Sequence, residues 1–232
     1  MRRVIVTGAS RGLGLEFTRQ LLARGDRVIA ACRDPQRAEA LSVLASAHPD
    51  RLHVRTLDVT DAGSIATFAE DVARAFDGID LLINNAGKLV AGERFGSVAA
   101  NSLRSSVATN AIGPFLLTQA LAALLAKGER AVVANISSQL GSIARTDSFY
   151  TPSYAISKAA LNMATVLLAH GLADSGVCAI AFHPGWVKTD MGGANAPLAP
   201  TASVAGMLAV ISKLKMEDSG AFVDYQGNSM PW

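Results

Sequence analysis

Short runs of apolar residues alternate along the chain with longer segments in which apolar residues recur at helical spacing. The short runs predict β-strands, and their continuous apolar character is typical of strands covered on both faces. The longer segments predict helices, the first of which stops at Gly25. The predicted strands lie at 4–6, 27–32, 52–57, 79–83, 131–136, 177–182 and 221–223, and the predicted helices at 12–24, 35–46, 61–76, 97–126, 152–174 and 201–214.

Strand–helix units that repeat in this way build a parallel sheet with helices on both faces. We therefore expect an α/β fold, a Rossmann-like doubly wound parallel sheet, in a single domain over 1–232. Ligands of such folds bind outside the carboxyl ends of the strands. The segment 184–200 is rich in glycine and proline and is expected to be a loop that covers the substrate.

Composition narrows the classes of function. Half of the 232 residues are hydrophobic and 17% are charged, which suits a well-buried globular protein. The net charge of +2 gives no reason to expect nucleic acid or a membrane as a partner. No apolar segment has the length of a signal peptide or a spanning helix, so a cytoplasmic protein is expected. Cys32 and Cys178 fall in predicted strands, where small buried hydrophobic residues are expected rather than metal ligands or a disulfide.

The first predicted strand leads into a glycine-rich turn, T-G-A-S-R-G-L-G at 7–14. Gly8 permits a sharp turn, Gly12 leaves the backbone open to a pyrophosphate, and Gly14 lets helix and strand pack closely. The helix that follows offers free N–H groups and a positive dipole end to phosphates. An ordinary glycine-rich turn is the alternative, but its place at the first strand–helix junction favours a dinucleotide site.

The T-G-x-x-x-G-x-G spacing of this turn resembles the signature of the short-chain dehydrogenase/reductase family. Other motifs of that family follow in order: N-N-A-G at 84–87, Y-x-x-x-K at 154–158 and P-G-x-x-x-T at 184–189. The ending 220–232 is similar to the branch that contains C-factor and the sniffer-type carbonyl reductases. The resemblance covers essentially the whole chain and implies an oxidoreductase.

Tyr154 and Lys158 are four residues apart, so they lie on one face of the predicted helix. A free phenol, with a pKa of about 10, is a poor proton donor near neutrality, and a lysine cation beside a positive nicotinamide ring is expected to lower that pKa. An ordinary amphipathic pair is the alternative for this motif alone. The resemblance implies that Tyr154 is the general acid or base and that Lys158 fixes the nicotinamide ribose. It also implies that Ser138 holds the substrate oxygen and that Asn110 bends its helix and anchors a water linked to the lysine.

Two of these assignments have local alternatives. Ser142 competes with Ser138, because Ser138 lies sixteen positions before Tyr154, a longer spacing than in many members of the family. The extra residues fall in 141–153 and predict a longer loop over the substrate pocket. A helix kink caused by the Gly-Pro pair at 113–114 is the local explanation for the bend at Asn110, and both explanations can hold.

Two arginines favour NADP(H) over NAD(H) as the cofactor. An NAD site usually places an acidic residue after the second strand, where this chain has Arg33, and Arg11 lies in the glycine turn. Two guanidinium groups can bind a 2′-phosphate, although Asp34 could oppose this and Arg33 alone could be a solvated charge. The resemblance implies that Asp58 contacts adenine. The residues expected to bind the cofactor are Gly8, Ser10, Arg11, Gly12, Leu13, Gly14, Arg33, Asp58, Val59, Asn85, Ala86, Gly87, Tyr154, Lys158, Pro184, Gly185, Val187 and Thr189.

The expected reaction is hydride transfer between NADP(H) and a small carbonyl or alcohol, without a metal. His183 lacks the partner spacing of a base or metal ligand, so a structural role is expected. Two other classes stay open: a signalling or regulatory protein of C-factor type that binds NADP(H) with little turnover, and a structural protein. The helices at 110–126 and 154–174 are rich in alanine and leucine, and the resemblance implies that they form a homodimer or homotetramer interface. Plain core is the alternative for these helices.

Overall fold

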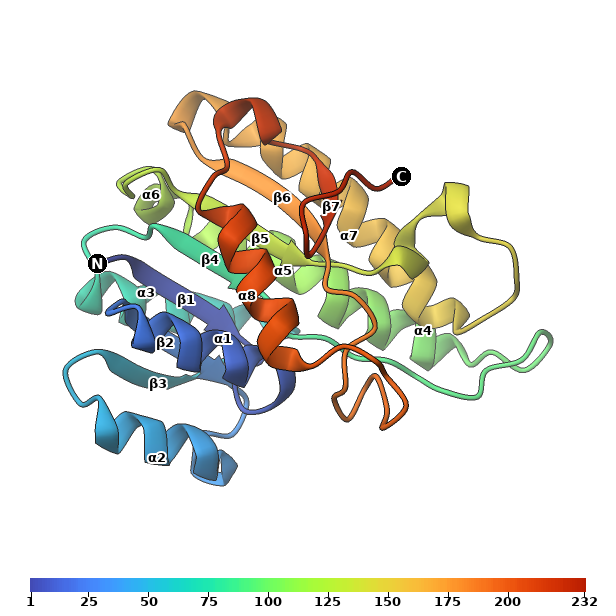
Figure 1. The fold of residues 1–232 in the computed structure, drawn as a ribbon, viewed down its shortest axis with the longest axis horizontal. Helices are drawn as coiled ribbons and strands as arrows, with labels where there is room; N and C mark the ends of the chain where they lie inside the picture. Colours follow the sequence, from blue (N-terminus) through green and yellow to red (C-terminus); the bar gives the residue numbers. More distant parts are fainter.

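Seven parallel strands form one sheet in the computed structural model, which describes all 232 residues (Figure 1). The strand order is β3-β2-β1-β4-β5-β6-β7, so the direction of winding reverses between β1 and β4. This confirms the predicted doubly wound α/β fold. The strands are β1 (Arg3–Thr7), β2 (Arg27–Cys32), β3 (Leu52–Thr56), β4 (Leu81–Asn84), β5 (Val132–Ile136), β6 (Cys178–His183) and β7 (Phe222–Asp224).

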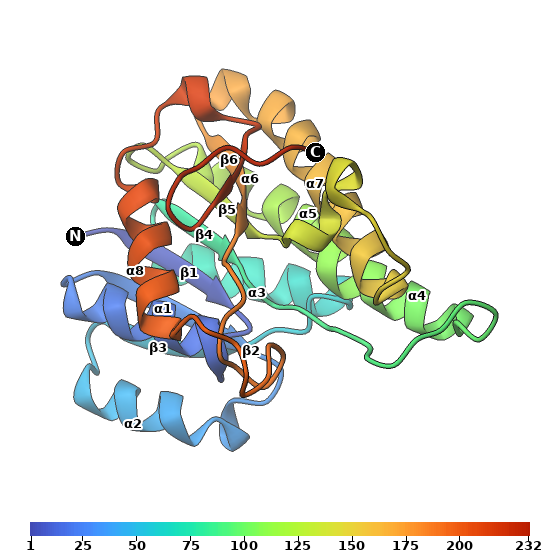
Figure 2. The ribbon, with the colours of Figure 1, turned by 45° about the vertical axis from the view of Figure 1, so that its right-hand side comes forward.

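Helices cover both faces of the sheet (Figures 1 and 2). Successive side chains of β1 point to opposite faces: Val4 and Val6 belong to one hydrophobic core, and Ile5 belongs to the other. The first core includes buried residues of α1, α2 and α8, and the second includes residues of α3, α5, α6 and α7. The helices are α1 (Gly12–Ala23), α2 (Glu39–Ala47), α3 (Ala62–Ala75), α4 (Ala100–Val107), α5 (Gly113–Ala120), α6 (Ala122–Leu125), α7 (Pro152–Gly171) and α8 (Pro200–Ile211).

The single helix predicted over 97–126 is wrong. A π-helical turn, Ala108–Ile112, separates α4 from α5, and a further break at Leu121 separates α5 from α6. Gly113 lies where a Cβ would stand 2.5 Å from the carbonyl oxygen of Val59, so the backbone passes the segment after β3 closely. Such π-helical turns occur often at functional sites, and this one contains Asn110.

Smaller differences concern the ends of other helices. Pro35 opens a 3₁₀ turn, Pro35–Arg37, and α2 begins only at Glu39, because the Asp34 side chain caps the short turn by accepting the Arg37 N–H. The helix predicted over 152–174 ends as an α-helix at Gly171 and continues as a 3₁₀ turn, Ala173–Ser175. No helix in the structure combines the length and apolar character that crossing a membrane requires.

Candidate active site

The predicted site residues gather at the carboxyl ends of the central strands. The glycine turn follows β1, the segment 85–87 follows β4, Ser138 follows β5 and Pro184 follows β6. Since all of these strands are parallel, the four segments meet at one edge of the sheet, on both sides of the point where the strand order reverses. This is the position at which open α/β sheets bind their ligands.

The glycine turn packs tightly against the segment after β4. Gly8 has a φ of 62°, and a Cβ at this position would lie 2.7 Å from the Cα of Ala86. A Cβ on Gly14 would lie 2.3 Å from the carbonyl oxygen of Gly8. The Asn85 side chain donates to the carbonyl of Thr7 at 2.9 Å, and the Thr7 hydroxyl accepts the N–H groups of Asn85 and Ala86. Asn85 and Ala86 therefore hold the turn in shape.

The start of α1 is open to a phosphate group. Its N-cap, Arg11, is extended and makes no side-chain cap, and the first turn of the helix has no acidic residue. The first N–H groups of such a helix have no partner within it. The Cγ2 of Thr189 lies 3.5 Å from the ideal Cβ of Gly12, so the segment after β6 closes over the same turn. The local geometry fits the pyrophosphate of a dinucleotide.

Ser138, Tyr154 and Lys158 are buried together where β5 ends beside α7. The hydroxyl of Ser138 faces the phenol of Tyr154. The Nζ of Lys158 donates to the carbonyl of Ile136 at 2.7 Å and lies 5.5 Å from the centre of the Tyr154 ring. Ser142 is turned elsewhere, because its hydroxyl donates to the carbonyl of Trp232. The structure therefore brings Ser138, rather than Ser142, to the phenol.

Burial shifts the pKa values of both groups on α7. It raises the pKa of Tyr154 to about 12, an effect that Ser138 partly offsets. It lowers the pKa of Lys158 to about 7, because the ammonium lacks a carboxylate partner. In the chain without a cofactor, desolvation of the phenolate therefore dominates the pKa of Tyr154. The predicted lowering applies to a phenol beside a nicotinamide ring as well as the lysine, and it stays a prediction. Near neutrality Tyr154 holds its proton, as a general acid must.

The amide of Asn110 fixes the segment after β4. Its Nδ2 donates to the carbonyl of Lys88 and to the hydroxyl of Ser157, each at 2.8 Å, and its Oδ1 accepts the Lys88 N–H at 2.7 Å. Both amide protons are therefore engaged by the protein. Asn110 thus connects Lys88, the residue after Gly87, to α7. Its side chain has no amide proton left to donate to the water that it was predicted to anchor.

The charged residues expected near a 2′-phosphate differ in their partners. Asp34 faces Arg37, whose N–H it accepts at 3.3 Å, so it is turned to its own 3₁₀ turn. Arg33 is exposed. Hydrogen bonds from Thr60 lower the pKa of Asp58, and the positive charge of Arg33 lowers it further. Arg11 forms an exposed ion pair with Asp190 at 3.2 Å. Of the two arginines predicted to bind the 2′-phosphate, Arg11 forms a salt bridge with a carboxylate and Arg33 does not.

The segment 184–189 is held from both sides. The carbonyl of Pro184 accepts the hydroxyl of Ser203 at 2.6 Å, and Val187 is buried and bridges to Leu198. The hydroxyl of Thr189 accepts the Gly192 N–H at 3.1 Å. His183 accepts the N–H of Gln139 through Nδ1 at 3.2 Å, and burial lowers its pKa to about 4. A neutral His183 thus holds the turn after Ser138, which fits the expected structural role.

Two other predicted residues have mainly packing contacts. Val59 is buried against Gly113, and Gly185 has a φ of 84° beside Leu198. Ser10 and Leu13 are half-buried in the glycine turn and in the first turn of α1.

A buried chain of polar side chains below the site was not predicted from the sequence. Asn84 donates to Asn135 at 2.8 Å, and Asn135 donates to Thr165 of α7 at 2.9 Å. An asparagine inside each of two apolar strands was the available signal, because buried amides need partners. These bonds link β4, β5 and α7 directly below the site. Glu93, which contacts Ser153 beside Tyr154, was also missed, since nothing nearby in the sequence marks it.

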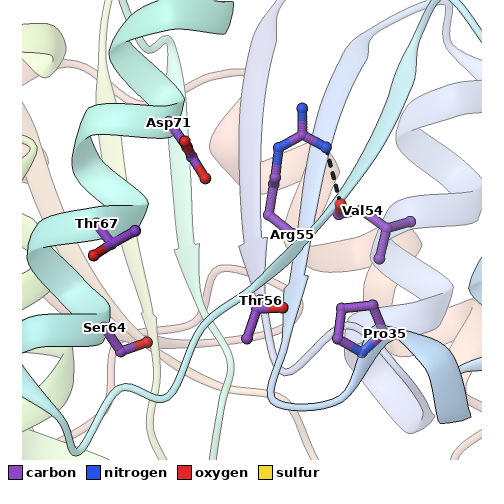
Figure 3. A pocket seen from close by; sticks show the side chains of 7 residues that line it. All are labelled: Pro35, Val54, Arg55, Thr56, Ser64, Thr67 and Asp71. Atoms are coloured by element: carbon purple, nitrogen blue, oxygen red, sulfur yellow. Dashed lines mark hydrogen bonds between the residues drawn. The ribbon is translucent and has the colours of Figure 1, made fainter.

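Two hollows lie away from the catalytic residues. The segment after Ser138 covers a hollow of about 540 Å³. The other wall of this hollow includes Ala155, Ile156 and Ala159, which lie on the side of α7 that faces away from Tyr154. The segment after Ser138 thus covers a hollow, but this hollow is not at the phenol, and the predicted cover over a substrate pocket stays a prediction. A second hollow, of about 340 Å³, lies at edge strand β3 (Figure 3). It is lined by Pro35, Val54, Arg55, Thr56, Ser64, Thr67 and Asp71, none of which was predicted as a site residue.

The fold and the site define a dinucleotide-dependent oxidoreductase, in which a buried tyrosine and lysine lie at the same edge of the sheet as the glycine turn. The family model described as short chain dehydrogenase matches residues 2–197, and the chain belongs to this family. The chain is 42% identical over 154 residues to C-signal of Myxococcus xanthus, which covers 66% of this chain and 93% of the relative.

Solved structures agree over the whole chain. The NADPH-bound carbonyl reductase from chicken fatty liver has a TM-score of 0.95 and 42% identity, covering 100% of this chain and 99% of that one. The carbonyl reductase Sniffer of D. melanogaster has a TM-score of 0.95 and 33% identity, covering 100% of both chains. Together with C-signal, these similarities confirm the branch predicted from the ending 220–232.

Proposed function

We propose that the chain reduces a small carbonyl compound with NADPH, or oxidises the corresponding alcohol with NADP⁺, with Tyr154 as general acid or base. The observation that carries this proposal is the buried set of Ser138, Tyr154 and Lys158 at the carboxyl ends of the strands. The similarity to an NADPH-bound carbonyl reductase over the full length supports it. A protein that only binds a dinucleotide has no need of a buried, protonated phenol at this position.

In the reductive direction the cofactor supplies hydride to the carbonyl carbon. Tyr154 gives its proton to the carbonyl oxygen, so the product is a neutral alcohol and Tyr154 is left as phenolate. Ser138 donates a hydrogen bond to the same oxygen and keeps it at the phenol. Lys158, once charged, stabilises the phenolate and holds the ribose that carries the nicotinamide. The glycine turn, 85–87 and 184–189 would hold the rest of the cofactor.

The choice of NADPH over NADH is assigned to Arg33. It occupies the discriminating position after β2, and Asp34 is turned toward Arg37. Replacing Arg33→Asp is expected to weaken NADPH binding far more than NADH binding, because only NADPH carries the 2′-phosphate that a guanidinium would bind. A titration of both cofactors tests this, with Arg37→Asp as the control at the neighbouring exposed arginine. Equal weakening of both cofactors in the Arg33 variant would contradict the assignment.

The function is tested by a panel of aldehydes, ketones and quinones, with consumption of NADPH as the measurement. Turnover of one or more members is the expected result. The similarity to C-signal favours a second candidate, an NADP(H)-binding signalling protein with little turnover. Tight NADPH binding with no turnover on the whole panel would support that candidate and contradict the first.

A homodimer in the cytoplasm is part of the same proposal. Five apolar side chains, half-exposed on the π-helical turn, α5 and α7, give the outer helices an uncovered apolar face. They are Ile112, Leu116, Ile156, Met163 and Leu167. Sedimentation of the wild-type protein should give a dimer or tetramer, and Met163→Asp should shift it toward the monomer. A wild-type monomer at all concentrations would contradict this part.

A further inference from the structure

The helix that carries Tyr154 has no cap from its own sequence. Thr151, the N-cap of α7, lies in the left-handed region with a φ of 41°, and its side chain makes no capping bond. Its hydroxyl is buried without a partner. The first N–H groups of a helix need partners from outside the helix, and Tyr154 stands in this first turn. The position of the phenol therefore depends on whatever holds the start of α7.

Glu93 supplies the missing partner from 60 residues away. Its Oε2 accepts the N–H of Ser153 at 3.0 Å, and its Oε1 accepts the hydroxyl of the same serine at 2.5 Å. Ser153 is fully buried and immediately precedes Tyr154. A carboxylate at this place also interacts favourably with the positive end of the helix dipole. One side chain thus accepts both hydrogen-bond donors of Ser153, its N–H and its hydroxyl.

The segment that bears Glu93 is itself anchored. Asn110 binds both the N–H and the carbonyl of Lys88, just after the predicted cofactor segment 85–87. Phe95 packs edge-on against Phe149, with ring centres 5.6 Å apart. The segment after β4 and the entry to α7 lie at the same end of the molecule in both views (Figures 1 and 2). Residues 88–95 therefore connect the predicted cofactor segment to the helix of the catalytic tyrosine.

We infer that Glu93 is a positioning residue, which fixes the Tyr154 phenol by capping α7 from the segment after β4. This inference rests on the proposed role of Tyr154. Glu93 touches neither the phenol nor the phosphate-binding turn in the structure; it acts through Ser153. Because misplacement of a reacting group by about 1 Å can slow a reaction about 100-fold, loss of this cap is expected to lower kcat more than it weakens cofactor binding.

The test compares Glu93→Ala and Glu93→Gln with the control Asp218→Ala. Asp218 also accepts a backbone N–H, that of Lys215, in a turn remote from the site. Glu93→Ala should lower kcat about 10- to 100-fold per bound NADPH, while the Kd for NADPH changes less than about two-fold. Glu93→Gln keeps one acceptor oxygen and should recover part of the rate. The control should retain the wild-type kcat.

Two further measurements separate positioning from general damage. Hydrogen exchange in the first turn of α7 should accelerate in Glu93→Ala and not in Asp218→Ala. Adding Ser153→Ala to Glu93→Ala should cost little more, because the hydroxyl contact that Ser153→Ala removes is already lost with Glu93. An unchanged kcat, unchanged exchange in this turn, or independent effects of the two substitutions would each overturn the inference. If Glu93→Ala does not fold, the cycle of Glu93→Gln with Ser153→Ala decides by the same criteria.

Failure of the proposed function has a different signature. In that case the wild-type protein turns over no carbonyl, or Tyr154→Phe is as fast as wild type, whatever happens at Glu93. The hydrogen-exchange measurement needs no turnover, so it still decides whether Glu93 holds the first turn of α7.

Discussion

Asp80 and Lys158 lie near opposite ends of the sheet, and they are almost equally buried, with 3% and 4% of their surfaces exposed. Asp80, at the amino end of β4, accepts hydrogen bonds from the Arg3 N–H, the Arg3 guanidinium and the Glu129 N–H. Lys158, at the carboxyl ends, has one partner, the carbonyl of Ile136. One buried charge is neutralised and the other is not.

The pKa values reflect this difference. Burial alone would raise the pKa of Asp80, but the hydrogen bonds from Arg3 and Glu129 outweigh it, and the pKa is lowered. For Lys158 nothing offsets burial, and its pKa falls to about 7. The amino end of the sheet is therefore built for stability, whereas the carboxyl end holds a buried amine that no carboxylate neutralises. Unfavourable burial of this kind is typical of functional sites.

The largest expected effect is on turnover, and it follows from removing the amine of Lys158. Lys158→Met keeps the volume of the stem and removes the amine, so we expect turnover to fall by about 100-fold or more. Stability should stay unchanged or rise, because no buried amine must be desolvated. Steady-state kinetics and urea unfolding measure the two quantities. If Lys158→Met keeps its activity, or loses several kcal/mol of stability, Lys158 serves stability rather than catalysis.

The opposite pattern is expected at Asp80. Asp80→Ala leaves the Arg3 guanidinium and the Glu129 N–H without their buried acceptor, and should lower the free energy of unfolding by about 3–5 kcal/mol. The folded fraction should keep its kcat. Asp77→Ala is the matched control, because Asp77 also pairs with Arg3 but its side chain is 91% exposed, so little change is expected. An equal loss of unfolding free energy in Asp77→Ala and Asp80→Ala would contradict the claim that the buried partner of Arg3 matters more than the exposed one.

A smaller effect is expected on the pH dependence of stability. The ordinary pKa of a lysine is 10.5, and that of Lys158 in the folded protein is about 7. Between these values the unfolded chain binds more protons than the folded one, so stability rises with pH, by up to about 1.4 kcal/mol per unit. Lys158→Met should lack this rise. Urea unfolding at several pH values gives the slope of unfolding free energy against pH for the wild type and for Lys158→Met. Equal slopes would mean that Lys158 is charged in the folded protein over this pH range.

The sequence predicted most of the carboxyl end and little of the amino end. The glycine turn and the Tyr154–Lys158 pair are local motifs, so spacing along the chain was enough to place them on one edge of the sheet. The bonds from Arg3 to Asp80 join residues 77 positions apart, and no local pattern marks them. The same holds for Glu93 and Ser153, which are 60 positions apart.

The errors have a common physical origin. The predicted helix over 97–126 follows a correct apolar pattern, but the π-helical turn contains Asn110, whose side chain binds Lys88 and Ser157 in distant parts of the chain. Likewise, the spacing of Tyr154 and Lys158 does not show that burial raises the pKa of the phenol in the folded chain. Periodicity predicts which face of a helix is buried, but it does not give the depth of burial or distant partners.

In the proposed reduction, the Tyr154 phenol, kept protonated by burial, delivers a proton to a carbonyl oxygen. The most direct measurement is kcat with saturating NADPH for Tyr154→Phe, beside Tyr150→Phe, which removes the hydroxyl of an exposed tyrosine four residues away. We expect Tyr154→Phe to lose about 100- to 10,000-fold in kcat with a nearly unchanged Kd for NADPH, while Tyr150→Phe stays close to wild type. A Tyr154→Phe enzyme that turns over at the wild-type rate would contradict it.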